Sequence, residues 1–122
     1  MTGEELRKAV FELLDTHPSI AKTAAHEHAH LYRTSSGRVI GIEPERIRFQ
    51  NLWVAKDDVD ASRLAGINKK AYQAADYGRS RPNHNLFGNG GFDDVDLICF
   101  KVTGIWQAVR VILEVAGDGG AS

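Results

Sequence analysis

The 122-residue sequence contains little cysteine, little proline and almost no net charge. A single cysteine, Cys99, excludes an internal disulfide and fits a reducing compartment. A formal net charge of −1 provides no overall basic surface to attract nucleic acid or an anionic membrane. No apolar run approaches the roughly 20 residues that span a bilayer, and the acidic start lacks the basic-then-apolar order of a signal peptide. These absences predict a cytoplasmic protein.

The composition is that of a globular protein, with 43% hydrophobic and 25% charged residues. A chain of this length is close to the commonest size for one domain, and the sequence contains no internal repeat. We therefore expect a single domain over residues 1–122, with a frayed C-terminus from about residue 117.

The first helix has clear local signals. Thr2 and Glu5 form a capping-box pair, which can satisfy two backbone amide groups at a helix start. Leu6 and Val10 begin an apolar stripe at helical spacing, and Pro18 disfavours helical geometry just before it. This pattern predicts a helix that ends near residue 15.

The remaining pattern predicts alternating helices and strands. Helices are expected at 18–32, 59–75 and 105–116, strands at 39–42, 46–55 and 95–103, and an irregular loop at 77–94. Gly66 lies inside the expected 59–75 helix, where glycine is unfavourable, so two shorter helices are the alternative for this segment. The predicted fold class is α+β, a small three-stranded mixed sheet packed by helices, in the order ααββαβα with the last strand central.

The last predicted helix, 105–116, is apolar on almost all sides. Its large side chains cannot all face one core, so part of this helix is expected to meet another surface. This predicts a homodimer or a protein partner that binds through residues 105–116.

The best chemical lead is the sequence His26-Glu27-His28-Ala29-His30. On a helix, His26 and His30 are one turn apart and project from the same side, so both imidazoles can reach one tetrahedral zinc ion. Glu27 would lie beside them and could act as general base on a metal-bound water.

This ten-residue neighbourhood resembles the zincin metallopeptidases, whose motif is His-Glu-x-x-His. The resemblance implies that His26 and His30 bind zinc and that Glu27 is the catalytic base. The family needs a third protein ligand, and this sequence supplies none at a family spacing. The candidates that remain by elimination are Glu43, Glu45, Asp57, Asp58 and His84.

An extended backbone would change the set of ligands. If residues 25–32 formed a strand, His26, His28 and His30 would share one face. The alanines in this segment favour the helix instead.

A second feature is the basic segment that precedes the glycine-rich part of the 77–94 loop. Arg79, Arg81 and His84, with asparagines beside them, are residue types that contact phosphates and unpaired bases. Cys99, in contrast, lies in an apolar run and is expected to be a buried structural thiol.

The sequence thus favours a zinc-dependent hydrolase that uses His26, Glu27 and His30. The alternative is a binding module without catalysis, either for nucleic acid through Arg79, Arg81 and His84 or for a protein through 105–116. A small regulatory or inhibitor protein belongs to this alternative as well.

Overall fold

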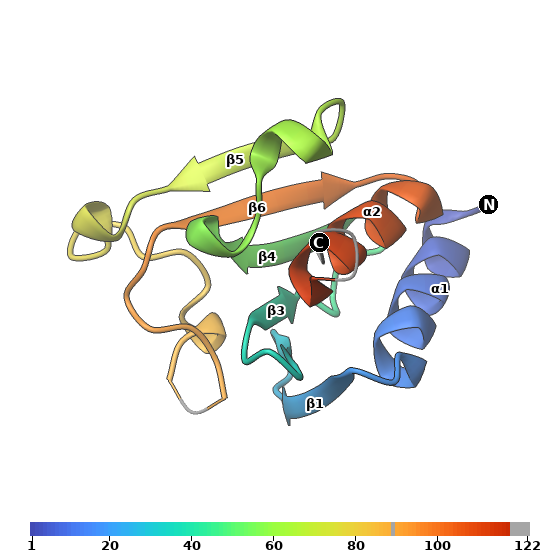
Figure 1. Cartoon of the computed structure of the whole chain (residues 1–122), viewed down its shortest axis with the longest axis horizontal. Coiled ribbons are helices and arrows are strands. Elements are labelled where there is room, and N and C mark those ends of the chain that lie inside the picture. Colours follow the sequence, from blue (N-terminus) through green and yellow to red (C-terminus); the bar gives the residue numbers. More distant parts are fainter. Residues whose placement is uncertain (89, 118–122) are drawn as a thin grey trace.

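The computed structural model describes residues 1–88 and 90–117, and in this part of the chain a six-stranded antiparallel sheet packs with two α-helices. The strand order across the sheet is β1-β2-β3-β4-β6-β5. Figure 1 shows the helices lying together, apart from the yellow-to-orange segment that joins β5 to β6. The bounds along the chain are α1 Gly3–Thr16, β1 Ile20–Ala25, β2 His30–Thr34, β3 Val39–Ile42, β4 Gln50–Ala55, β5 Asn68–Tyr72, β6 Leu97–Val102 and α2 Ile105–Ala116.

The first helix forms as the sequence predicts. The Thr2 hydroxyl accepts a hydrogen bond from the Glu5 amide at 3.1 Å, and the Glu5 carboxylate accepts one from the Thr2 amide at 2.7 Å. Leu6, Val10 and Leu14 form its buried stripe. These signals are local in the sequence, so the start of α1 could be predicted without knowledge of the sheet.

The predicted helix over 18–32 is wrong, because this segment is a β-hairpin. β1 pairs with β2 in antiparallel register, for example Lys22 with Tyr32. In β2, Leu31 and Tyr32 are both fully buried but belong to the two different hydrophobic clusters of the molecule. Only an extended backbone sends neighbouring side chains to opposite faces, so tertiary packing overrides the helix preference of the alanines.

The predicted helix over 59–75 is also wrong. A 3₁₀ turn, Ala61–Leu64, is followed by Gly66 and then by the edge strand β5. Gly66 has a φ of +88°, which a continuous right-handed helix does not allow. The glycine therefore ends the turn and lets the chain reverse into the sheet.

The predicted three-stranded mixed sheet and the order ααββαβα are corrected by these two changes. The strands expected around 39–42, 46–55 and 95–103 do form, but β1, β2 and β5 join them and every pairing is antiparallel. β6 lies inside the sheet, between β4 and β5, which fits its continuous apolar sequence.

Different parts of the chain pack on the two faces of the sheet. One face packs against α1 and α2, and the cluster there includes Tyr32, Ile40 and Phe100. The other face is covered by the segment between β5 and β6, through Leu86 and other apolar side chains. Gly41 permits this cover, because a Cβ atom at Gly41 would lie 2.6 Å from Cδ2 of Leu86.

The last helix ends at Gly117, whose φ of +81° gives a left-handed cap, in agreement with the helix expected over 105–116. Val111 and Ile112 are buried, whereas Trp106 is 76% exposed and Leu113 is 40% exposed. The expected partner surface at 105–116 stays a prediction. The frayed end expected after Gly117 lies outside the described residues.

Across residues 1–88 and 90–117, neither helix combines the length and the apolar character that crossing a membrane requires.

Candidate functional site

The histidine motif lies on the β1–β2 hairpin and not on a helix. His26 begins the connecting turn, and its amide donates to the Ala29 carbonyl at 2.9 Å. His30 is the first residue of β2. The one-turn helical spacing that would aim His26 and His30 at one ion is therefore absent. The turn also interrupts the alternation on which the strand alternative depended.

His30 faces the helix side of the sheet. Its ring meets Phe11 of α1 edge-on, with the centroids 5.1 Å apart, and it lines a pocket together with Lys22 and Asp15. Burial lowers the pKa of His30, and the positive charge of Lys22 lowers it further. Nδ1 of His30 is buried with no hydrogen-bond partner among the described residues.

Within the described ranges, no three or more His, Cys, Asp or Glu side chains are grouped so that they could hold a metal ion. The zinc-hydrolase function with His26, His30 and Glu27 stays a prediction. It assumed a helix over these residues, and the structure has a β-hairpin there. Three of its possible third ligands, Glu43, Glu45 and His84, lie in a different place, where they line a pocket together with His28.

That place is a pocket of about 520 Å³, here called the His28 pocket. It opens at the edge of the loop-covered face, where the β1–β2 turn, the β3–β4 connection and the loop before β6 meet. The residues that line it are His28, Glu43, Glu45, Arg46, Asn51, Trp53, Tyr72, Pro82, Asn83, His84, Asn85 and Cys99.

The side chains of His28 and Glu45 are hydrogen-bonded to each other in the His28 pocket. Nδ1 of His28 makes a short hydrogen bond with Oε1 of Glu45, and Nε2 of His28 lies 3.9 Å from Glu27. The hydrogen bond and the negative charge of Glu45 raise the pKa of His28 above its ordinary value. The carboxylate thus favours the charged imidazolium and holds the ring by Nδ1, which leaves Nε2 for proton transfer.

Glu43 differs from Glu45, because its carboxylate already accepts hydrogen bonds from neighbouring side chains of the sheet. Asn51 donates to Oε1 at 2.8 Å and the Trp53 indole donates to the same oxygen at 3.0 Å. Arg46 lies 3.6 Å from Oε2, and the Glu43 side chain is only 12% exposed. Glu43 is therefore a structural anchor that fixes Arg46 and Trp53 along the pocket wall.

His84 reaches the pocket from the loop that covers the sheet. It begins the 3₁₀ turn His84–Leu86, which is capped by the Asn83 side chain. The Asn83 amide also donates to the His28 carbonyl at 2.8 Å. This bond joins the two chain segments that carry the imidazoles, although they are far apart in the sequence.

The two arginines predicted for nucleic acid have separate environments. Arg81 pairs with Asp94 at 2.6 Å and lies over the Phe87 ring at 4.7 Å. Arg79 lines a pocket next to β5, and its guanidinium has no ion-pair partner in the described part of the chain. Arg81 is thus used to hold the loop, and Arg79 is available to a ligand.

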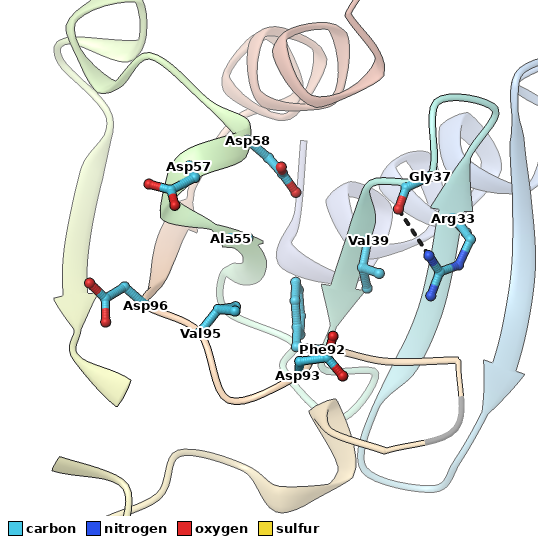
Figure 2. Close-up of a pocket in the computed structure, with 10 residues that line it drawn as sticks. All are labelled: Arg33, Gly37, Val39, Ala55, Asp57, Asp58, Phe92, Asp93, Val95 and Asp96. Carbon is cyan, nitrogen blue, oxygen red and sulfur yellow. Dashed lines mark hydrogen bonds between the residues drawn. The ribbon is translucent and has the colours of Figure 1, made fainter. Parts of the chain in front are cut away.

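A second concave region, the acidic pocket, has a volume of about 250 Å³. Figure 2 shows that the carboxylates of Asp57 and Asp96 point to the opposite side from those of Asp58 and Asp93. Asp96 accepts a hydrogen bond from the Ala74 amide at 2.8 Å, and burial raises the pKa of Asp58. These carboxylates do not converge, so the acidic pocket offers no defined binding geometry.

Cys99 lines the His28 pocket as a buried thiol. It is 8% exposed, and burial raises the pKa of its thiol to about 12. The sequence-based prediction of a structural thiol is consistent with this environment.

Comparison with known protein families, with curated proteins and with solved structures gives no match for this chain. The function has to be inferred from the pockets themselves. Sequence patterns miss the His28–Glu45 pair, because its members are 17 residues apart and meet only when β2, β3 and β4 are in register.

Proposed function

We propose that this protein is an acid–base enzyme that cleaves RNA at the His28 pocket. The observation that carries the proposal is that two imidazoles, His28 and His84, line one pocket, and that Glu45 orients one of them by a hydrogen bond to Nδ1. Two such groups allow one to accept a proton while the other donates one, which is the arrangement needed to move a phosphoryl group between oxygens.

The chemistry of the pocket walls favours a substrate that brings its own nucleophile. No serine or threonine is among the described residues that line the pocket, and the Cys99 thiol is held protonated by burial. The Glu43 carboxylate is occupied by Asn51 and Trp53. RNA supplies a nucleophile beside every phosphodiester, the ribose 2′-hydroxyl.

The step that follows is a transesterification. His84 accepts the proton of the 2′-hydroxyl, and the 2′-oxygen forms a bond to phosphorus. The bond from phosphorus to the 5′-oxygen breaks, and Nε2 of the His28 imidazolium gives its proton to that leaving oxygen. The products are a 2′,3′-cyclic phosphate and a free 5′-hydroxyl, and no electron acceptor is needed.

The other charged residues of the pocket fit supporting roles. Arg46, half exposed and 3.6 Å from Glu43, lines the same pocket and would supply positive charge to the phosphate oxygens of a bound strand. Glu45 is a positioning residue that holds the His28 ring and stabilises its charged form. Each imidazole is expected to contribute about 100-fold to 10,000-fold in rate.

The test is cleavage of a single-stranded RNA oligonucleotide in the presence of a chelator. We expect cyclic-phosphate products, no cleavage of the same oligonucleotide with deoxyribose at the scissile position, and a large loss of rate in His28→Ala and His84→Ala. His26→Ala is the matched control, since His26 lies in the same turn but does not line the pocket. Loss of activity in His26→Ala or on chelation, with His28→Ala unaffected, would overturn the proposal in favour of the zinc prediction.

A further inference from the structure

A second pocket adjoins the His28 pocket along the β5 edge of the sheet. This Arg79 pocket has a volume of about 500 Å³. Tyr72 lines both pockets and is therefore their shared wall. The described residues around the Arg79 pocket are Lys70, Ala71, Tyr72, Gln73, Asp76, Tyr77, Arg79 and Ser80.

The shared wall is an aromatic ring held in a fixed place. The ring centroids of Tyr72 and Trp53 are 5.0 Å apart with a tilt of 44°. Trp53 is itself fixed by its hydrogen bond to Glu43. The Tyr72 ring packs on Trp53 and borders two pockets. It therefore offers a stacking surface whose position is fixed before a ligand binds.

Positive charge lies over this ring. Nζ of Lys70 is 5.0 Å from the Tyr72 ring centroid, and Lys70 pairs with Cys99 across the sheet. Arg79 contributes a second cation to the pocket, against the single carboxylate of Asp76. The pocket therefore combines a net positive lining with a stacking aromatic, in a protein whose overall net charge is −1.

We propose that the Arg79 pocket binds the nucleotide next to the cleaved phosphodiester of single-stranded RNA, with its base stacked on Tyr72 and its phosphate beside Arg79 and Lys70. This inference rests on the proposed function for the neighbouring scissile site, but its binding test does not require cleavage. Stacking on Tyr72 needs an unpaired base, so duplex RNA is excluded. The strand then runs from the β5 edge over Tyr72 into the His28 pocket.

The binding experiment uses oligonucleotides with 2′-O-methyl ribose, which lack the nucleophile and cannot be cleaved by this mechanism. We expect a single-stranded hexanucleotide to bind at least about ten-fold more tightly than a dinucleotide, since only the longer strand fills both pockets. Arg79→Ala should weaken hexanucleotide binding about ten-fold. It should also reduce the slope of the logarithm of the binding constant against the logarithm of salt concentration by about the amount that one phosphate contact contributes. Tyr72→Leu should weaken it to a similar extent, and Tyr72→Phe, which keeps the ring, should not.

Arg48→Ala is the matched control, because it removes an exposed positive charge that lines neither pocket. Equal effects of Arg48→Ala and Arg79→Ala, equal binding of the dinucleotide and the hexanucleotide, or equal binding of duplex and single strand would each overturn the inference. Binding that depends on Arg79 and Tyr72 without cleavage of unmodified RNA supports this site and removes the proposed function. Cleavage of unmodified RNA that Arg79→Ala leaves unchanged at every oligonucleotide length supports the proposed function and overturns the inference about the Arg79 pocket.

Discussion

The side-chain amide of Asn83 donates a 2.8 Å hydrogen bond to the backbone carbonyl of His28, across 55 positions of the sequence. The same side chain caps the turn His84–Leu86, because its Oδ1 accepts from the Asn85 amide at 3.0 Å. One residue therefore joins the turn that carries His28 to the loop that carries His84. We therefore expect Asn83 to help set the placement of the two imidazoles in the pocket that both line.

Asn83 substitutions should separate the link to His28 from the cap of the turn. Asn83→Asp keeps the oxygen that caps the turn but cannot donate to the His28 carbonyl, and Asn83→Ala loses both. We expect both variants to lower kcat for RNA cleavage by about ten-fold or more, because a small displacement of a catalytic group is costly. The loss of stability, measured by urea unfolding, should be larger for Asn83→Ala, at about 1 kcal/mol.

The charge introduced by Asn83→Asp needs its own control. Asn85→Asp places the same charge on a residue that lines the same pocket and has no bond to His28. Because the Asn85 side chain donates to Oδ1 of Asn83 at 3.1 Å, Asn85→Ala, which loses this bond without adding charge, is measured beside it. A fall in kcat of the same size in Asn85→Asp would show that charge, and not the broken link, explains the Asn83→Asp result. A change in KM alone in either Asn83 variant would contradict the positioning role.

Glu45→Gln should lower the pKa of His28. In the native protein the hydrogen bond and charge of Glu45 raise this pKa, and Glu27 adds a weaker charge effect from 3.9 Å. An NMR titration of the His28 ring measures the change directly. We expect a clear decrease in Glu45→Gln and a smaller decrease in Glu27→Gln, and equal decreases would contradict the assignment of Glu45 as the main partner.

The sign of the accompanying pH effect follows from linkage. A folded-state pKa above the unfolded value means that the His28–Glu45 contact stabilises the fold fully below the unfolded pKa, and that this contribution is lost as pH rises through the folded pKa. The same titration removes the proposed acid. Cleavage rate should therefore fall on the alkaline side of the profile, and Glu45→Gln should move this limb to lower pH.

Gly41→Ala should destabilise the loop cover through one specific clash. The new Cβ would lie 2.6 Å from Cδ2 of Leu86, a fully buried side chain of the loop cluster. Overpacking of this kind costs about 1–3 kcal/mol, and Leu86→Ala alone should cost about 2–5 kcal/mol by leaving a cavity. The double variant should cost less than the sum, because the smaller side chain removes the clash.

Chemical denaturation of the four proteins in this cycle measures the coupling. Gly78→Ala is the matched control, since a Cβ at Gly78 has no atom within 4 Å among those described. Additive effects of Gly41→Ala and Leu86→Ala would show that the loop does not pack on β3 as described. The coupled result would confirm the contact of Leu86 with Gly41, which holds the loop that carries His84 against β3.

The success of sequence-based prediction varied with how local the determining interactions are. The start of α1 follows from Thr2 and Glu5, and the strands expected at 39–42, 46–55 and 95–103 follow from their own β-branched and apolar residues, although β4 begins only at Gln50 and β6 at Leu97. The hairpin at 20–34 has no such local signal. Its backbone is decided by Leu31 and Tyr32, which are buried on opposite faces of the sheet by partners distant in the chain.

The candidate site illustrates the same limit. The sequence points to Glu43, Glu45 and His84 among the possible third ligands for His26 and His30, and the structure brings all three to the pocket that His28 lines. Helical spacing pairs residues four apart, whereas the real neighbours are set by the hairpin turn and by strand register. Arg79 and Arg81, predicted to act together, have different environments for a similar reason. Arg81 forms an ion pair with Asp94 and lies over the Phe87 ring, and both partners lie further along the loop than the predicted set of Arg79, Arg81 and His84.

The helix-covered face provides a test of stability that is independent of the proposed site. The fully buried Tyr32 donates a 2.6 Å hydrogen bond from its hydroxyl to the Asp15 carboxylate. Burial raises the pKa of Asp15, but hydrogen bonds from Tyr32 and Lys22 outweigh it, so this pKa lies below its ordinary value. Tyr32→Phe should lower the free energy of unfolding by about 1 kcal/mol at neutral pH, a modest value because Asp15 is 44% exposed.

This loss should depend on pH in one direction. A depressed carboxyl pKa contributes stability above the unfolded pKa, and the contribution disappears as pH falls through the folded pKa. The difference between native protein and Tyr32→Phe should therefore be constant near neutral pH and shrink in acid. In Tyr77→Phe the lost partner is the neutral Val95 carbonyl, at 2.9 Å, so the difference should not change with acid. Parallel acid profiles for the two variants would contradict a charged Asp15 acceptor, since only an ionised partner makes the Tyr32 contribution titrate.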